Sequence, residues 1–408
     1  MALDAFGRLR TSECFTTFSY YPSLLTDNSS LDIDTWVTLT GGSGSATYNS
    51  NNYINMSVST TNDYVVRITK QPMEYQPGKS RLVYITGTML GEDVNGDTLT
   101  TRLGLFNIDD STPPEVREGV YFQTDGTNLQ WVETTQVATT TVNQSSWNVD
   151  TFDGSGPSGK TLTSSDLQVA MLYVIDQEWL GVGRIRVGFI IEGITYYAHA
   201  FNHSLSVQYT KTPRQRICYQ INGTSISSGP HTMRQMCSTA ISESGYFPLC
   251  PRVAVGTNSN GVTMTTAGEK YILLGLTLQS SYVDGLIKLL GSTTSYAANT
   301  GKTGFYEIQL HSSNGSIGSI NGSLTYSSIP NSISQFAIGD GTQTINSDGF
   351  ILSAGFTSGQ TNAIIVRTPN DTLLTRTMCT SYDTFYLIGS GNANNDQMFA
   401  TFEFIESI

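Results

Sequence analysis

Short apolar segments separated by turn residues recur along the whole chain. Residues 64–69, 80–87 and 169–175 are examples, and turn pairs such as Asp125-Gly126 stand between such segments. Runs of this length, rich in β-branched residues and bounded by Gly, Asn and Asp, predict β-strands rather than helices. Strands at short intervals predict an all-β protein built from β-sandwiches of jelly-roll type. We find no fixed-period repeat, which argues against a β-helix or a propeller.

The chain of 408 residues is long enough for more than one domain. We expect a large β-sandwich domain over residues 31–280 and a smaller C-terminal β-sandwich domain over residues 281–408. Residues 1–30 precede them as an extended N-terminal arm, because they are short, mixed in character and aromatic-rich, with no partner segment nearby. Such a terminus is ordered only when another surface holds it.

Four residues of this arm are candidate assembly residues. Apolar and arginine side chains on an exposed segment suit docking onto a neighbouring subunit. The candidates are Phe6, Arg8, Leu9 and Arg10.

Charge and composition exclude several classes of function. Charged residues make up 13% of the chain, about half the usual share, and the net charge is −12. An acidic chain with 21 Lys and Arg offers no electrostatic footprint for nucleic acid. No basic run or long apolar stretch indicates membrane contact. The first residues lack the basic and apolar regions of a signal peptide, so we expect synthesis in a cytosol without export by that route.

Cysteine and histidine usage gives no sign of a cofactor or metal. The five cysteines are scattered without C-x-x-C spacing, so we expect buried thiols rather than zinc ligands. His199 and His203 are four apart, but no third ligand is in view. Residues 93–97 begin like a calcium loop, D-x-N-x-D, but the late Glu of such a loop is missing.

The best enzyme motif is the Gly-rich segment at residues 154–161. Gly154, Gly159, Lys160 and Thr161 satisfy the phosphate-loop pattern GxxxxGK(S/T). A true phosphate loop needs a buried strand before it and a helix after it. The preceding residues are too polar, and the following ones favour turns and caps over helix interiors. We therefore interpret the segment as a long polar loop between two antiparallel strands.

A second enzyme hypothesis is a pair of carboxylates at the end of the apolar run. Asp176 and Glu178 are two apart, so on a strand they share one face. Such a pair could perform acid/base chemistry on a glycosidic bond. The alternative is a solvated strand end facing Arg184 or Arg186, and nothing else in the sequence favours catalysis.

Six segments follow one another along the chain as recognisable motifs: residues 4–12, 75–80, 118–122, 147–150, 153–159 and 178–183. In this order they resemble a family of viral structural proteins found in tailed bacteriophages and some large DNA viruses. The resemblance covers about residues 1–250 and carries no catalytic residues. It implies a component of a virus particle, and it explains the Gly-rich loop as a structural signature.

Three functions follow as hypotheses. The first is a non-enzymatic structural component of a virion, such as a head decoration, vertex, fibre or tail protein. It would act through protein–protein contacts with other virion proteins, and we expect a homotrimer by analogy with such assemblies. The second is a carbohydrate-binding adhesin of the particle that contacts a host surface glycan through the C-terminal domain. The third is an enzyme, either a depolymerase using Asp176 and Glu178 or a nucleotide hydrolase using Lys160.

Overall fold

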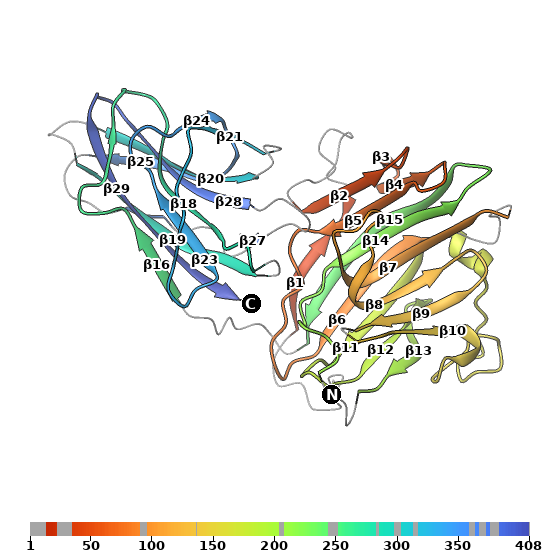
Figure 1. Cartoon of the computed structure of the whole chain (residues 1–408). Coiled ribbons are helices and arrows are strands. Elements are labelled where there is room, and N and C mark those ends of the chain that lie inside the picture. The colour runs from red at the N-terminus through yellow and green to blue at the C-terminus, as the bar shows by residue number, and fades with distance from the viewer. Residues whose placement is uncertain are drawn as a thin grey trace. The chain divides into compact units, whose positions relative to one another are not determined.

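The computed structural model describes residues 14–22, 35–89, 96–135, 137–203, 208–243, 252–282, 285–297, 303–312, 317–358, 364–366, 373–375 and 383–407. Within these residues the regular structure is β-strand, apart from short 3-10 turns such as η2 (Gln144–Ser146) and η3 (Ser164–Gln168). Figure 1 shows the strands gathered into two separate units. The prediction of an all-β protein made of sandwiches is confirmed.

The two compact units are Met1–Phe247 and Pro248–Ile408, so the boundary expected near residue 280 is wrong. The strands β16 (Arg252–Gly256) and β17 (Val262–Met264) pair with β29 (Asp396–Ser407), and β18 (Tyr271–Leu278) pairs with β28 (Asp383–Gly391). All three therefore belong to the second unit. Their apolar pattern identifies them as strands but does not reveal which distant strand each one joins.

The predicted arm at residues 1–30 is also partly wrong. Its aromatic segment forms β1 (Phe15–Tyr20), which pairs antiparallel with β15 (His231–Ser242). Phe18 and Tyr20 are buried, and their rings lie 6.3 and 5.0 Å from that of Trp36. The partner strand lies more than 200 residues away, which is why a local pattern could not place it. Phe6, Arg8, Leu9 and Arg10 lie outside the described residues.

The first unit is a sandwich of two antiparallel sheets. Sheet I follows the order β13-β12-β11-β6-β15-β4-β3, with β1 on β15, and sheet II follows the order β10-β9-β8-β7-β14-β5-β2. The remaining bounds in sheet I are β3 (Ser45–Asn49), β4 (Tyr53–Val58), β6 (Arg81–Thr88), β11 (Met171–Gln177), β12 (Ile185–Ile191) and β13 (Ile194–Phe201). Those in sheet II are β2 (Trp36–Gly41), β5 (Tyr64–Thr69), β7 (Thr98–Ile108), β8 (Val116–Thr124), β9 (Leu129–Thr134), β10 (Thr139–Asn143) and β14 (Ile217–Ser225).

The connections wrap the chain in jelly-roll fashion. The consecutive strands β14 and β15 are inner strands of opposite sheets, β14 between β5 and β7 and β15 between β4 and β6. The ribbon formed by the consecutive strands β14 and β15 is thus enclosed by two earlier ribbons, one formed by β4 and β5 and the other by β6 and β7. Each sheet contributes one face to a shared core.

Local sequence explains individual strands and turns. In β4 every second residue is buried, so Ile54, Met56 and Val58 face the core. The hairpin between β12 and β13 uses Glu192 and Gly193, with φ of +54° and +79°. Two consecutive positive φ values are those of a two-residue hairpin turn whose twist matches the strands.

The core of the first unit is aromatic at one end. The ring of Phe122 lies 5.1–5.5 Å from those of Trp131, Tyr173 and Phe189, all of them buried. These residues come from both sheets. Aromatic pairs at such separations add stability beyond their buried area, so this cluster joins the two layers.

The second unit is also two antiparallel sheets around a separate apolar core. One sheet holds β16, β29 and β19 with β26, and β17 and β27 join its strands; the other follows the order β21-β24-β18-β28-β20-β25, with β22 and β23 attached. Residues 286–290 form the first part of strand β19. The remaining bounds are β19 (Leu286–Ala297), β20 (Thr303–Ser312), β21 (Ser319–Asn321), β22 (Ser327–Ser328), β23 (Ser334–Ile338), β24 (Thr344–Ser347), β25 (Phe350–Ser358), β26 (Ile364–Val366) and β27 (Leu373–Thr375).

Candidate functional site

The Gly-rich segment at residues 154–161 is a loop that binds a carboxylate of its own chain. It lies between β10 and β11, and it is followed by the short turn η3 rather than a long helix. The expectation of two antiparallel strands around the loop is wrong, because β10 and β11 belong to different sheets. The carboxylate of Asp150 accepts hydrogen bonds from the backbone N–H groups of Phe152 (2.9 Å) and Ser158 (2.7 Å). A Cβ atom added at Gly156 would lie 2.1 Å from an oxygen of Asp150. The anion position that a phosphate would need is thus filled.

Lys160 is engaged elsewhere. Its ammonium lies 2.8 Å from the carboxylate of Glu192, in the hairpin turn between β12 and β13. The side chain of Lys160 is 32% exposed, and that of Glu192 is 74% exposed. The geometry supports the interpretation of a polar loop and places no phosphate-binding helix beside Lys160.

Asp176 and Glu178 each face an arginine. Asp176, buried at the end of β11, forms an ion pair with Arg186 and accepts a hydrogen bond from Tyr197 (2.7 Å). Glu178 lies 3.5 Å from Arg184. Burial raises the pKa of both carboxyls, against the opposing attraction of Arg186 and Arg184 respectively. The carboxylates face Arg186 and Arg184, as the structural alternative expected. The expectation of a solvated strand end is wrong, because Asp176 and Glu178 are both buried.

The two histidines at spacing four have separate partners. The ring of His199 accepts a hydrogen bond from the backbone N–H of Asn148 (3.2 Å). His203 lies 2.9 Å from Glu133 and 2.6 Å from the carbonyl of Gly183, and it stacks on Tyr209. No cluster of three potential metal ligands occurs among the described residues.

The calcium-like segment lies mostly outside the described residues, which resume at Gly96. Its last carboxylate, Asp97, accepts hydrogen bonds from the backbone and hydroxyl groups of Ser227 (both 2.6 Å) and contacts His231 (2.9 Å). This carboxylate therefore ties the start of β7 to the connection between β14 and β15. Of the cysteines, Cys218 is buried as expected, whereas Cys14 and Cys237 are exposed.

Sequence patterns did not reveal a row of polar side chains across sheet II, which we call the polar ladder. Strand register places Gln123 opposite both Arg102 and Gln130, and it places Gln130 opposite Asn143. On the other side of β7, Arg102 lies opposite Gln220 of β14. Residues directly opposite in neighbouring strands share one face of a sheet, so five strands contribute one member each.

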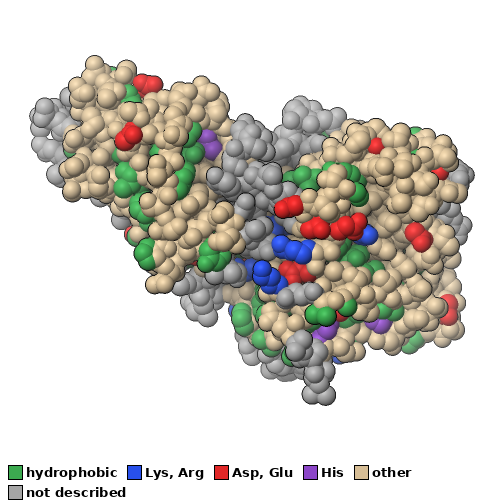
Figure 2. Space-filling view, viewed as in Figure 1, with side chains coloured by type: hydrophobic (Ala, Val, Ile, Leu, Met, Phe, Trp, Pro, Cys, Tyr) green, Lys and Arg blue, Asp and Glu red, His purple; other side chains and the backbone are tan. Residues whose placement is uncertain are grey.

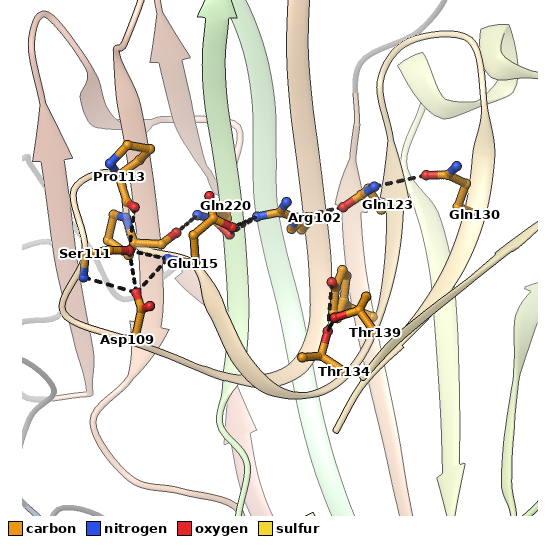
Figure 3. A network of polar contacts seen from close by, with 12 residues as sticks. Arg102, Asp109, Ser111, Pro113, Glu115, Gln123, Gln130, Thr134, Thr139 and Gln220 are labelled. Atoms are coloured by element: carbon orange, nitrogen blue, oxygen red, sulfur yellow. Dashed lines mark hydrogen bonds and ion pairs between the residues drawn. The ribbon is translucent and has the colours of Figure 1, made fainter. Parts of the chain in front are cut away.

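The ladder members are hydrogen-bonded in sequence, and Figure 3 shows the part of the ladder from Gln220 to Gln130. Arg102 donates to Gln123 (2.7 Å), Gln123 donates to Gln130 (2.9 Å), and Gln130 donates to Asn143 (2.8 Å). Arg102 also lies 3.3 Å from the amide oxygen of Gln220. The bonds therefore run in one direction from Arg102 outward, an arrangement in which each bond polarises the next.

A loop held by its own hydrogen bonds places one carboxylate beside Arg102 of the ladder. Glu115 lies 3.5 Å from Arg102, and its side chain is 57% exposed. The backbone N–H of Glu115 donates to Asp109 (2.9 Å), which also accepts from Ser111 (Figure 3). Burial alone would raise the pKa of Asp109, but these hydrogen bonds outweigh it and lower the pKa.

The ladder changes from buried to open along its length. Gln220 is fully buried and donates to the carbonyl of Pro114 (2.7 Å), whereas Asn143 at the far end is exposed. Figure 2 shows acidic and basic side chains gathered in one area of the first unit, on a surface otherwise mostly of neutral groups. The only sign of the polar ladder in the sequence is a polar residue at alternate positions of several strands. Their alignment into one row becomes clear only from the pairing register of the strands.

Comparison with protein-family models finds no match, and no curated protein matches the chain. Among solved structures, the chain is similar to a carbohydrate esterase from the Shiga toxin-encoding bacteriophage phi24B, with 9% identity, a TM-score of 0.33, and coverage of 57% of this chain and 100% of the other. An endo-1,3-beta-glucanase from Streptomyces sioyaensis has 11% identity, a TM-score of 0.36, and coverage of 58% and 99%. The carbohydrate recognition domain of Emp47p has 12% identity, a TM-score of 0.36, and coverage of 58% and 100%.

Proposed function

We propose that the protein is a structural component of a virus particle that binds carbohydrate on the polar ladder of its first unit. The observation that carries the binding proposal is the aligned row of amides at Gln123, Gln130 and Asn143. A carboxamide has two donor hydrogens and two acceptor positions, and the ladder bonds use only part of them. A sugar hydroxyl both donates and accepts, so the remaining positions match a surface rich in hydroxyl groups.

The ladder favours a neutral glycan chain over an acidic one. Its one cation, Arg102, is already opposed by Glu115, and Asp109 adds negative charge nearby. Neighbouring strands lie about 4.8 Å apart, so the four steps from β10 to β14 span about 19 Å. A ligand that follows the row would lie across the strands as an extended chain.

The proposed role as a virion component rests on the family resemblance and on the ion pairs that the best catalytic candidates form within the chain. Asp176 and Glu178 face Arg186 and Arg184, and Lys160 faces Glu192. We propose that the protein acts by binding, without turnover, as part of the virion. We further propose a homotrimer in contact with other virion proteins. None of the helices in the described part of the chain is long and apolar enough to cross a bilayer.

Binding to neutral glycans tests the carbohydrate proposal. Wild-type protein should bind members of a neutral-glycan array, and Gln130→Ala should weaken binding about 5-fold for each ligand hydrogen bond lost, or about 1 kcal/mol. Asn202→Ala, which removes an exposed amide next to sheet I, is the matched control and should bind like wild type. Silence of the wild type on the array would refute the proposal, as would equal losses in both variants.

Purified particles test the location. Immunogold electron microscopy with antibody to residues 248–408 should label the particles, and the position of the label will distinguish head from tail. If denatured particles contain no such chain, the virion proposal fails. Sedimentation equilibrium should give a trimer of the 44.3 kDa chain, and a monomer at all concentrations would contradict that part.

A further inference from the structure

The second unit has a pocket that no part of the proposed function uses. Its volume is about 440 Å³, within the usual range of small-molecule sites. It is lined by residues of β20 and β25, by the end of β28 with the turn that follows, and by the turn between β17 and β18. These segments are distant in sequence but adjoin at one end of one sheet.

Two phenylalanines form the aromatic wall of the pocket. Phe305 lies directly opposite Phe356 in the pairing of β20 with β25, and their ring centroids are 5.3 Å apart. Phe356 is 73% exposed, so its ring contributes little to the core of the unit. An exposed aromatic ring beside a concavity offers a flat apolar face to a ligand.

The rest of the wall is uncharged and includes three polar side chains. Ser390 lies opposite Phe305 in the pairing of β20 with β28, so it shares a face with the aromatic pair, and Thr303 and Asn392 also line the pocket. All the lining residues lie within the described ranges, and none carries a charge. Nothing lies within 4 Å of the place where a Cβ atom at Gly268 would stand, so the backbone there is open to a ligand.

We infer that this pocket binds a single neutral sugar ring. The C–H face of the ring packs on Phe356, and its hydroxyl groups exchange hydrogen bonds with Ser390 and Asn392. A charged sugar would leave its charge without a partner, and a wholly apolar ligand would leave the polar side chains unpaired. The inference is independent of the polar ladder, which lies in the other unit.

Saturation-transfer difference NMR on the full chain tests the inference. The Gln130→Ala background is used, so that failure of the ladder and failure of the pocket are distinguishable. The probes are the methyl glycosides of glucose, galactose, mannose and N-acetylglucosamine, with glucuronate as the charged comparison. We expect transfer to the ring protons of at least one neutral probe, and at least a 10-fold lower affinity in Phe356→Ala.

The matched control is Phe350→Ala, an exposed phenylalanine on the same strand that does not line the pocket. It should bind the neutral probe like its parent. Because Phe356 is mostly exposed, its alanine variant should unfold at the same urea concentration as the parent. The inference is overturned if no neutral probe binds at millimolar concentration, if glucuronate binds better than every neutral probe, or if the two variants lose binding equally.

Discussion

Replacing Asp150 with alanine tests whether the Gly-rich loop is structural. Asp150 is only 5% exposed, and its carboxylate accepts the backbone N–H groups of Phe152 and Ser158. Leaving a buried donor unpaired costs about 1–3 kcal/mol. Phe152 is fully buried and Ser158 is half-buried, so water can replace the second bond in part. We expect Asp150→Ala to lower the free energy of unfolding by roughly 2–4 kcal/mol.

The pH dependence follows from the pKa of the same carboxyl. Burial alone would raise the pKa of Asp150, but the hydrogen bonds from Ser158 and Phe152 outweigh it and hold the pKa below its ordinary value of 3.8. A lowered pKa means that the stabilisation is present above the unfolded-state pKa and is lost as the pH falls through the folded-state pKa. The difference between wild type and variant should therefore be constant near neutral pH and shrink below about pH 4.

Urea titration followed by tryptophan fluorescence is the assay. All four tryptophans lie in the first unit, so their emission reports the unfolding of that unit alone. Asp153→Asn, in the same loop but exposed, is the control and should change stability less. A change under about 0.5 kcal/mol in Asp150→Ala, or ATP binding by wild-type protein that Lys160→Ala abolishes, would refute the structural interpretation.

Three further substitutions test other buried polar groups. Asp63→Asn replaces a buried carboxylate that accepts five hydrogen bonds from neighbouring turns, and it should cost about 2–4 kcal/mol in urea titrations; no change would contradict this role. Arg81→Met leaves carbonyl acceptors unpaired around a guanidinium that is 2% exposed, so a loss of about 3 kcal/mol is expected, and a more stable variant would refute it. Burial alone lowers the pKa of His203, but Glu133 and a backbone carbonyl raise it above 6.5. A raised pKa means that protonated His203 stabilises the fold below the unfolded-state pKa, and this stabilisation is lost as the pH rises through the folded-state pKa. His203→Gln should therefore lower the free energy of unfolding more at about pH 5.5 than at about pH 8, and the reverse order would refute this.

Strand positions were readily predicted because local pattern determines them. Residues 64–69 were expected as a strand and form β5 with those bounds, and residues 80–87 correspond to β6, which is shifted by one residue. The run at 169–175 was expected to begin at Val169, but that residue is 64% exposed and β11 begins at Met171. Apolar character alone does not tell which apolar residues have a neighbouring strand to cover them.

Strand partners, and therefore the sites, could not be predicted. The polar ladder exists because β10, β9, β8, β7 and β14 align one polar residue each, and a shift of one residue in any strand would break the row. The unit boundary failed for the same reason, since β18 pairs with a strand more than 100 residues later. The phosphate-loop motif was interpreted as structural because the buried strand before it and the helix after it were missing. The role of Asp150 could be seen only in the three-dimensional structure.

The enclosed ribbon of β14 and β15 has a consequence for the order of folding during synthesis. Until residues 217–242 have left the ribosome, β4, β5, β6 and β7 lack their central partners, and their edges stay open to other chains. Contacts that close such long loops form late and slowly. The second unit has the same property, since β29, its last strand, lies between β16 and β19. Each unit can therefore complete its sheets only after nearly all of its residues have been released.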